Sequence, residues 1–153
     1  MKKNKVKFYT SNSCKWTISK HKLPIVHTTR IFYSLPQKFS TDDEYVVFPD
    51  IKPAARHHYL IVTRKHIRNA KQLTVEHKSL VEKLVQIAKQ VLNENGADLS
   101  DVRFGFHWPP FNSIQHLHLH AICPASSMSF VSRLIFRPDS WWFVSPEYVM
   151  SRL

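Results

Sequence analysis

The chain has 153 residues, of which 43% are hydrophobic and 22% charged, which is enough apolar side chain for one domain with a sizeable core. The formal net charge is +11 at pH 7, and only 2 residues are glycine. Gly96 and Gly105 cannot build a dinucleotide fingerprint or a P-loop, so phosphate chemistry must rely on side chains, with the 10 histidines as first candidates.

The first 40 residues carry most of the positive charge. They hold nine of the 22 basic side chains and none of the 11 acidic ones, whereas residues 41–153 are nearly neutral. We interpret residues 1–40 as a basic arm that need not be ordered, and residues 41–153 as the compact domain. The arm has three open interpretations: a solvated tail, a contact to nucleic acid or another acidic surface, and a transit peptide, which its excess of Lys over Arg does not fit.

The sequence gives no sign of a membrane or secreted protein. It has no run of about 18 apolar residues, and no apolar stretch follows Lys2 and Lys3 as a secretory signal requires. Cys14 and Cys123 form neither a Cys-x-x-Cys pair nor a disulfide framework. We expect a soluble protein of the cytoplasm or nucleus, with reduced thiols and no membrane partner.

Two strands and a long helix open the compact domain. Residues 45–48 predict a short strand that ends in a turn at residues 49–53, and residues 58–63 predict a largely buried strand. Thr74 is expected to cap the helix that follows, and Gly96 to adopt a left-handed conformation just past its end. The helix is indicated by a 3.6-residue apolar period at Leu80, Val81, Leu84, Ile87, Ala88, Val91 and Leu92.

Further strands follow the helix. Residues 102–107 predict a strand, residues 109–112 a loop and residues 116–122 a last strand, and residues 141–143 add apolar bulk. Strands on both sides of one long helix indicate an α+β fold with a mostly antiparallel sheet.

The last predicted strand carries three histidines at alternate positions. Because side chains of a strand alternate between its faces, His116, His118 and His120 share one face and the residues between them pack into the core. Zinc is one interpretation, although the outer two histidines lie about 13 Å apart on a straight strand, so a further element would have to complete the site. We favour metal-free chemistry, in which a neutral imidazole is the nucleophile and its neighbours orient it and transfer protons. A polar strand surface without function is the third interpretation.

The segment from His116 to Ile122 has the pattern His-x-His-x-His-x-x with an apolar residue at each x. This pattern resembles the signature of the histidine triad superfamily of nucleotide hydrolases and transferases. The resemblance covers residues 42–153 and points to the Hint branch, through residues 48–55, 58–62, 65–67 and 105–111 and the tail at residues 133–144. It implies a mostly antiparallel five-stranded sheet with one long helix and a short helix packed on it.

The resemblance also implies catalytic roles. His118 would attack the α-phosphorus of an adenylated substrate and form a transient nucleotidyl-histidine, which water then resolves. His116 and His120 would steady the phosphate and relay protons. His58 matches the family's fourth histidine, and Ser113 would contact the phosphate and serve the leaving nitrogen.

The same resemblance implies a nucleoside pocket. Asp50 would bind the ribose hydroxyls, and Ile51, Phe48 and Leu60 would enclose the base, although a plain core role is equally open for these apolar residues. No metal and no cofactor are needed. We interpret the other six histidines as structural or surface residues, with His107 as the first exception because it lies in the loop before Ser113.

These expectations describe an adenosine phosphoramidase, a hydrolase that cleaves the P–N bond of AMP-amines such as AMP-lysine, or acts on related aminoacyl adenylates, and releases AMP. Two alternatives stay open: an aprataxin-like enzyme that removes AMP from nucleic-acid ends, with residues 1–40 contacting nucleic acid, and a nucleotide-binding regulatory module with little turnover. Members of this branch are commonly two-fold dimers, so we expect a homodimer that binds a purine nucleotide.

Overall fold

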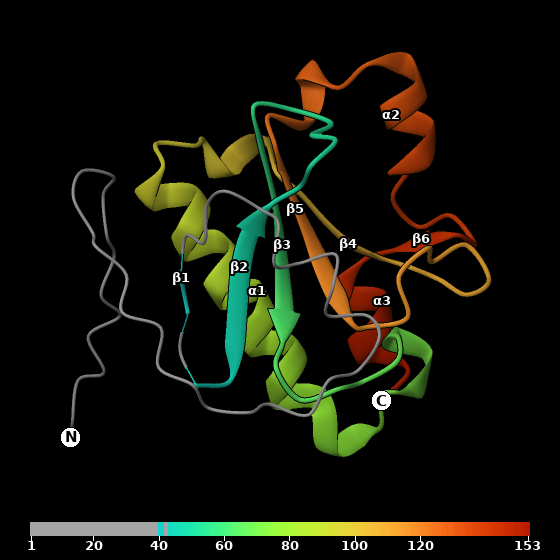
Figure 1. Ribbon diagram of the computed structural model, residues 1–153. Coiled ribbons are helices and arrows are strands. Elements are labelled where there is room, and N and C mark those ends of the chain that lie inside the picture. Colours follow the sequence, from blue (N-terminus) through green and yellow to red (C-terminus); the bar gives the residue numbers. More distant parts are fainter. Residues whose placement is uncertain (1–39, 42) are drawn as a thin grey trace.

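The computed structural model describes residues 40–41 and 43–153 (Figure 1). Its strands are β1 (Ser40–Thr41), β2 (Tyr45–Pro49), β3 (His57–Thr63), β4 (Arg103–His107), β5 (His118–Cys123) and β6 (Phe143–Val144). Its helices are α1 (Lys78–Glu94), α2 (Phe130–Ile135) and α3 (Pro146–Ser151), and single 3₁₀ turns occupy Ala70–Gln72, Val75–His77, Leu99–Asp101 and Ala125–Ser127. Within this part of the chain, no helix has the length and apolarity that a membrane span requires. The predicted arm lies almost wholly outside the described residues, so its boundary stays a prediction.

One antiparallel sheet runs through the domain in the order β1-β2-β3-β5-β4-β6. In the central pair, Leu60 lies opposite His120 and Val62 opposite His118. On the other side of β5, Gly105 of β4 lies opposite His120. The predicted α+β fold with one long helix is confirmed, and the sheet has six strands when the two-residue edge strands β1 and β6 are counted.

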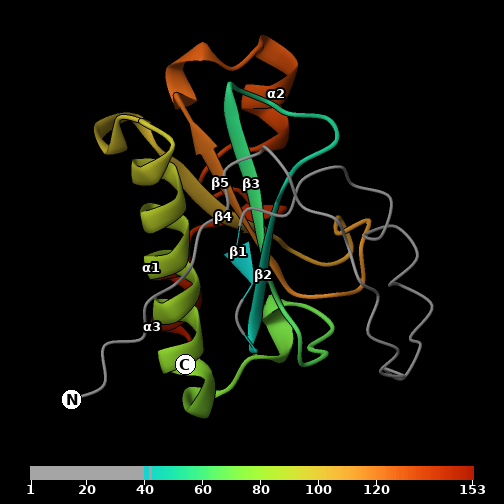
Figure 2. The ribbon, with the colours of Figure 1, turned by 60° about the vertical axis from the view of Figure 1, so that its left-hand side comes forward.

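Helix α1 covers one face of this sheet (Figure 2). Its apolar stripe is buried, as the 3.6-residue period predicts, and packs on the inner side chains of β3 and β5, among them Ile61 and Leu119. Leu117 and Ala121 are buried in the same cluster, which confirms the predicted core face of the histidine strand. Since α1 occupies that face, alternation along β5 turns His118 and His120 to the opposite one.

The ends of α1 follow the predicted signals with one shift. The helix begins at Lys78, after the 3₁₀ turn at Val75–His77 that Thr74 precedes. Thr74 is the N-cap residue of this turn rather than of α1 itself, and its backbone N–H donates to Nδ1 of His77 over 3.1 Å. Past the other end, Gly96 has a φ of 72°, the left-handed conformation that the sequence predicts.

Strand β5 begins two residues later than the sequence predicts. The backbone N–H of Leu117 donates to the carbonyl of Ile67 over 2.7 Å, so this part of the chain follows the segment after β3. On the other side, the pairing of β4 with β5 ends at Gly105, and β4 continues along β6, where His107 lies opposite Phe143. The two strands therefore separate beside the histidines.

Candidate active site

His118 is held so that one of its ring nitrogens is free to react. Its Nδ1 donates to the backbone carbonyl of His116 over 2.7 Å. A neutral imidazole has one donor and one acceptor nitrogen, so this bond leaves Nε2 with a bare lone pair. Burial lowers the pKa of His118 below the usual value of 6.5, against smaller opposite effects of the His116 carbonyl and the Asp50 carboxylate. His118 is therefore a neutral imidazole at neutral pH, the form that a nucleophile needs.

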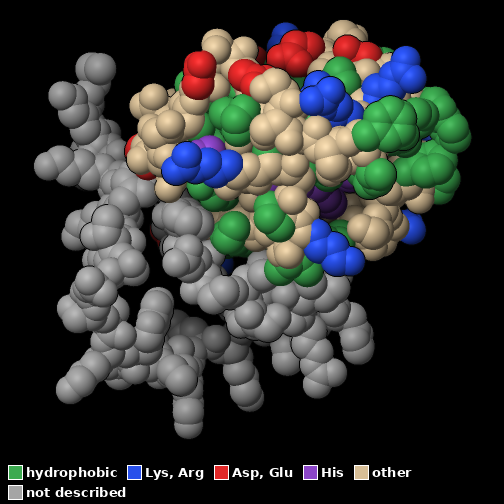
Figure 3. Space-filling view, turned by 90° about the horizontal axis from the view of Figure 1, so that it is seen from above, with side chains coloured by type: hydrophobic (Ala, Val, Ile, Leu, Met, Phe, Trp, Pro, Cys, Tyr) green, Lys and Arg blue, Asp and Glu red, His purple; other side chains and the backbone are tan. Residues whose placement is uncertain are grey.

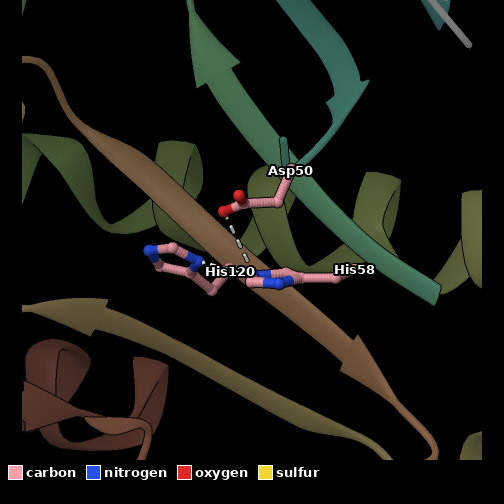
Figure 4. Close-up of side chains that lie close together, drawn as sticks. All are labelled: Asp50, His58 and His120. Atoms are coloured by element: carbon pink, nitrogen blue, oxygen red, sulfur yellow. Dashed lines mark hydrogen bonds and ion pairs between the residues drawn. The ribbon is translucent and has the colours of Figure 1, made fainter. Parts of the chain in front are cut away.

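His120 and His58 form a buried pair between β5 and β3. Nδ1 of His120 lies 2.9 Å from Nε2 of His58, and Nδ1 of His58 accepts the backbone N–H of Ala54 over 3.1 Å. Burial lowers the pKa of His58 to about 4, against a smaller opposite effect of the Asp50 carboxylate. Burial, with smaller contributions from neighbouring imidazoles, lowers the pKa of His120 well below its usual value. Oδ2 of Asp50 lies 3.6 Å from the same Nε2 of His58. Figure 4 marks this contact with a dashed line.

Asp50, His58 and His120 also offer three metal-ligand atoms within 4.8 Å of one another. A divalent ion would need a lone pair on Nε2 of His58, and that nitrogen carries the proton because Nδ1 accepts the Ala54 amide. Binding at Nε2 would shift the proton onto Nδ1, where it would oppose the amide. The hydrogen bonds of this cluster therefore fit an imidazole pair better than a metal site.

His107, the first exception expected among the histidines without a predicted role, packs against the buried histidine pair. Its ring lies 5.0 Å from the ring of His120 and 5.1 Å from that of Phe143, centroid to centroid. Its Nδ1 is buried without a hydrogen-bond partner among the described residues. Burial, with a contribution from His118, lowers its pKa to about 4. The alternation of β4 is the signal that could have found His107, because His107 lies two residues after Gly105 and therefore on the same face of the sheet as Gly105 and its partner His120.

Aromatic rings from the C-terminal part of the chain enclose the histidines. Phe136, next to the end of α2, lies 5.2 Å from the rings of both His58 and His120. Phe143 lies 6.0 Å from His120. No local pattern could have predicted these contacts, because they depend on how residues 130–144 return to the sheet. Figure 3 shows histidine side chains in a hollow that hydrophobic and basic side chains border.

The other two predicted catalytic residues, His116 and Ser113, do not belong to the buried histidine cluster. Nε2 of His116 donates to the carbonyl of Thr63 over 2.6 Å, and its Nδ1 lies 3.2 Å from Nδ1 of His66. Both nitrogens of His116 are therefore engaged by the protein, and its observed contribution to the site is the carbonyl that orients His118. Ser113 lies exposed in the loop before β5.

The predicted nucleoside residues lie near one end of the sheet. Phe48 and Leu60 are buried in one cluster with Val62, on the same face as the histidines. Ile51 is 66% exposed, and Asp50 is partly exposed beside it. Residues of both predicted groups thus share one face, with Asp50 in contact with His58.

An antiparallel sheet backed by one long helix, with a buried neutral histidine whose Nδ1 is tied to the carbonyl two residues earlier, defines a nucleotide-handling protein of the histidine triad class. The comparisons agree. The model of the family described as "Scavenger mRNA decapping enzyme C-term binding" matches residues 26–135, and the chain belongs to this histidine triad family.

The chain is similar to individual proteins of two kinds, which bear the names of a phosphoramidase and of aprataxin. The chain is 46% identical over 114 residues to "Adenosine 5'-monophosphoramidase HINT3" of Xenopus tropicalis, covering 74% of each protein. It is 48% identical over 113 residues to the protein of the same name from Mus musculus, covering 73% of this chain and 68% of that protein. It is also 32% identical over 119 residues to "Aprataxin" of Danio rerio, which covers 73% of this chain and 35% of that protein. Among solved structures, "Hnt3 in complex with DNA and guanosine" has the same fold, with a TM-score of 0.59, 24% identity, and 82% of this chain and 74% of that chain covered.

Proposed function

We propose that this protein is an adenosine phosphoramidase, which hydrolyses the P–N bond of AMP-amines through a nucleotidyl-histidine. The observation that carries the proposal is the bare Nε2 of His118, oriented by the bond from Nδ1 to the His116 carbonyl. The two HINT3 relatives, which bear the name of this activity, support it. The buried, neutral state of His118 also argues for a nucleophile rather than a binding module alone.

The reaction has two steps, and each inverts the configuration at the α-phosphorus. Nε2 of His118 bonds to the α-phosphorus as the P–N bond breaks, and the bonding electron pair leaves with the nitrogen, which takes up a proton to become the free amine. Water then bonds to the same phosphorus, His118 departs with its electrons, and AMP is released. The fixed Nδ1–H bond to the His116 carbonyl stabilises the positive charge that His118 carries in the intermediate.

The nucleoside is expected to lie along the end of β2 and the start of the loop after it. A carboxylate is a strong hydrogen-bond acceptor, and the partly exposed carboxylate of Asp50 can reach the ribose hydroxyls. Ile51, Phe48 and Leu60 supply apolar surface for a purine base. Since Phe48 and Leu60 are already buried, we propose that Ile51, which is exposed, loses the most solvent-accessible area when the base binds.

Turnover of a fluorogenic adenosine phosphoramidate tests the proposal. Wild-type protein should release the amine, and His118→Ala should lose at least about a thousandfold in kcat, the scale of removing a nucleophile. The matched control is His57→Ala, since His57 lies on the same sheet but opposite Cys123, whose side chain packs in the α1 core. Equal turnover by His118→Ala and wild type, or none by wild type, would remove the assignment.

A second candidate function is removal of AMP from nucleic-acid ends. The similarity to aprataxin and the nine basic side chains of residues 1–40 favour it. The test is AMP release from a 5′-adenylated oligonucleotide by the full chain and by a full chain with Lys2, Lys3, Lys5 and Lys7 changed to Gln. A role of the arm requires that the Gln variant lose activity on the oligonucleotide and keep it on the small phosphoramidate. Equal activity of both proteins on the oligonucleotide would argue against it.

We also propose that the protein forms a two-fold homodimer. The outer face of α1 is polar, whereas Phe130, Val131 and Trp141 are each more than 60% exposed, so the C-terminal part of the chain offers the apolar surface. Sedimentation should give the mass of two chains for the wild type, and a lower association constant for Phe130→Ser. A monomer at all concentrations would contradict the proposal.

A further inference from the structure

Two contacts of His58 fix the position of its proton. The backbone N–H of Ala54 donates to Nδ1, so Nδ1 is the acceptor nitrogen and Nε2 carries the hydrogen of the neutral ring. Asp50 supports the same assignment independently. Its Oδ2 lies 3.6 Å from Nε2, and a carboxylate favours the tautomer with the proton on the nitrogen that it faces (Figure 4).

The proton of His58 in turn fixes that of His120. Nε2 of His58 lies 2.9 Å from Nδ1 of His120, and because His58 donates, Nδ1 of His120 must accept. The hydrogen of neutral His120 is therefore on Nε2. That nitrogen is buried and has no partner in the part of the chain that the structure describes, which is unfavourable unless a ligand supplies an acceptor.

The same contacts oppose a charged His120. An imidazolium would carry a second hydrogen on Nδ1, directed at the N–H of His58, and His58 can become an acceptor only by placing its own hydrogen against the Ala54 amide. The surroundings agree with this. His107 from β4 and His118 from β5 face the pair, and Phe136 packs on both rings. Among the described residues, the one negative charge beside the pair is the Asp50 carboxylate, whose Oδ2 lies 3.6 Å from Nε2 of His58, the nitrogen that faces His120. Burial accordingly lowers the pKa of His120 well below its usual value.

We propose that His58 is a positioning residue that holds His120 as a neutral Nε2–H donor, which binds a non-bridging phosphoryl oxygen and gives up no proton during the reaction. The proposal rests on the proposed function, since the phosphoryl group is that of the nucleotide. It differs from the proton relay that the family resemblance implies for His120. A fixed donor aimed at the oxygen where charge develops stabilises the transition state without being consumed.

The proton of the leaving group then has another source. A water molecule gives its proton to the leaving nitrogen, and the hydroxide that results attacks the phosphorus of the nucleotidyl-His118. One water is consumed, one amine and one AMP are released, and the protonation of His120 is the same before and after.

The protonation of both rings can be observed directly. Proton–nitrogen NMR of the full chain with isotope-labelled histidine separates protonated from bare ring nitrogens, and His58→Gln and His120→Gln assign the signals. Between about pH 5 and pH 8, where an ordinary imidazole titrates, both residues should carry hydrogen on Nε2 alone, with and without AMP. A hydrogen on Nδ1 of His120 in either state would overturn the proposal. This measurement does not depend on turnover, so it separates the failure of this proposal from that of the proposed function.

Variants at His120 test the role of its donor. Glutamine keeps an N–H near the position of Nε2 but cannot act as an acid, whereas alanine keeps neither. We expect His120→Ala to lose at least about a hundredfold in kcat, the scale of one preorganised donor, and His120→Gln to lose no more than about a tenth of that factor. Equal loss in both variants would show that His120 must transfer a proton. At His58, the same comparison should give a smaller loss for Gln than for Ala.

Discussion

At the scale of single residues, His118 owes its reactivity to a backbone carbonyl two residues earlier. A strand ordinarily places that carbonyl in a ladder, but β5 begins at His118, so the carbonyl of His116 is available to the Nδ1 hydrogen. The imidazole is thereby oriented without a carboxylate partner. The position at which β5 begins therefore determines how the nucleophile is oriented.

The lowered pKa of His118 predicts the acid limb of the pH profile. Its neutral form persists below the usual pKa of 6.5, because burial disfavours the imidazolium. We expect kcat/KM for the phosphoramidate, after subtraction of uncatalysed hydrolysis, to stay level as the pH falls through 6.5 and to decline only at lower pH. A halving of kcat/KM near pH 6.5 would show that His118 titrates as an exposed imidazole.

The sequence was sufficient to predict which face of the sheet the histidines occupy, but not which residues contact them. Period two in residues 116–122 predicts that His118 and His120 share a face, and the structure agrees. The contact of His107 with His120 depends on where β4 stops pairing with β5, and the engagement of His116 by Thr63 depends on the path of the chain before β5. Alternation along β4 can indicate the face on which His107 lies, but neither contact follows from local spacing alone.

At the scale of elements, the sheet opens beside the site, and Phe143 fills the space over Gly105. A Cβ on Gly105 would overlap the Phe143 ring, which itself packs on His107. Glycine at this position lets β6 approach β4 closely enough to place that ring.

Replacing this glycine should therefore affect both stability and activity. We expect Gly105→Ala to lower the free energy of unfolding by about 1–3 kcal/mol, the usual effect of overpacking, and to reduce phosphoramidate turnover because Phe143 and His107 must move. The control is Gly96→Ala, which has open space around its Cβ and a φ of 72°, and should cost about 1 kcal/mol without changing kcat. Chemical denaturation and turnover of the two variants measure both effects. Wild-type turnover by Gly105→Ala would contradict the role of this contact.

The elements differ in how well their sequences specify them. Helix α1 follows from its own apolar period, and Gly96 marks its end, so both could be predicted locally. The start of β5 could not, because it is set by the hydrogen bond from Leu117 to Ile67, residues 50 positions apart in the printed sequence.

At the scale of the whole molecule, the buried histidines should make the fold sensitive to acid. The pKa values of His58 and His107 fall to about 4 in the native state, and that of His120 falls well below 6.5. Between pH 6.5 and about 4, the unfolded chain binds protons that the native protein does not, so the free energy of unfolding falls as the pH is lowered through this window.

Urea denaturation at pH 7 and pH 5 tests this expectation. The unfolding free energy should be lower at pH 5, with each unit of pKa difference worth about 1.4 kcal/mol. His107→Gln should show a smaller difference between the two pH values, because it removes one of the buried imidazoles. An unfolding free energy independent of pH would mean that these side chains are accessible to protons in the native state.

The net charge of +11 can now be placed within the molecule. Most of it belongs to residues 1–40, and the site described here is built from neutral imidazoles and Asp50. The fold class of the compact domain could be predicted because the apolar period of α1 and the alternation of β5 are local patterns. The role of the arm could not, because charge alone does not distinguish a solvated tail from a nucleic-acid contact.

The covalent intermediate tests the central claim most directly. Wild-type protein mixed with an adenosine phosphoramidate is quenched during turnover, digested, and examined by mass spectrometry for an AMP adduct. We predict the adduct on the peptide that contains His118, at Nε2, and its absence in His118→Ala. Turnover without any adduct on that peptide, or an adduct on another histidine, would contradict the account.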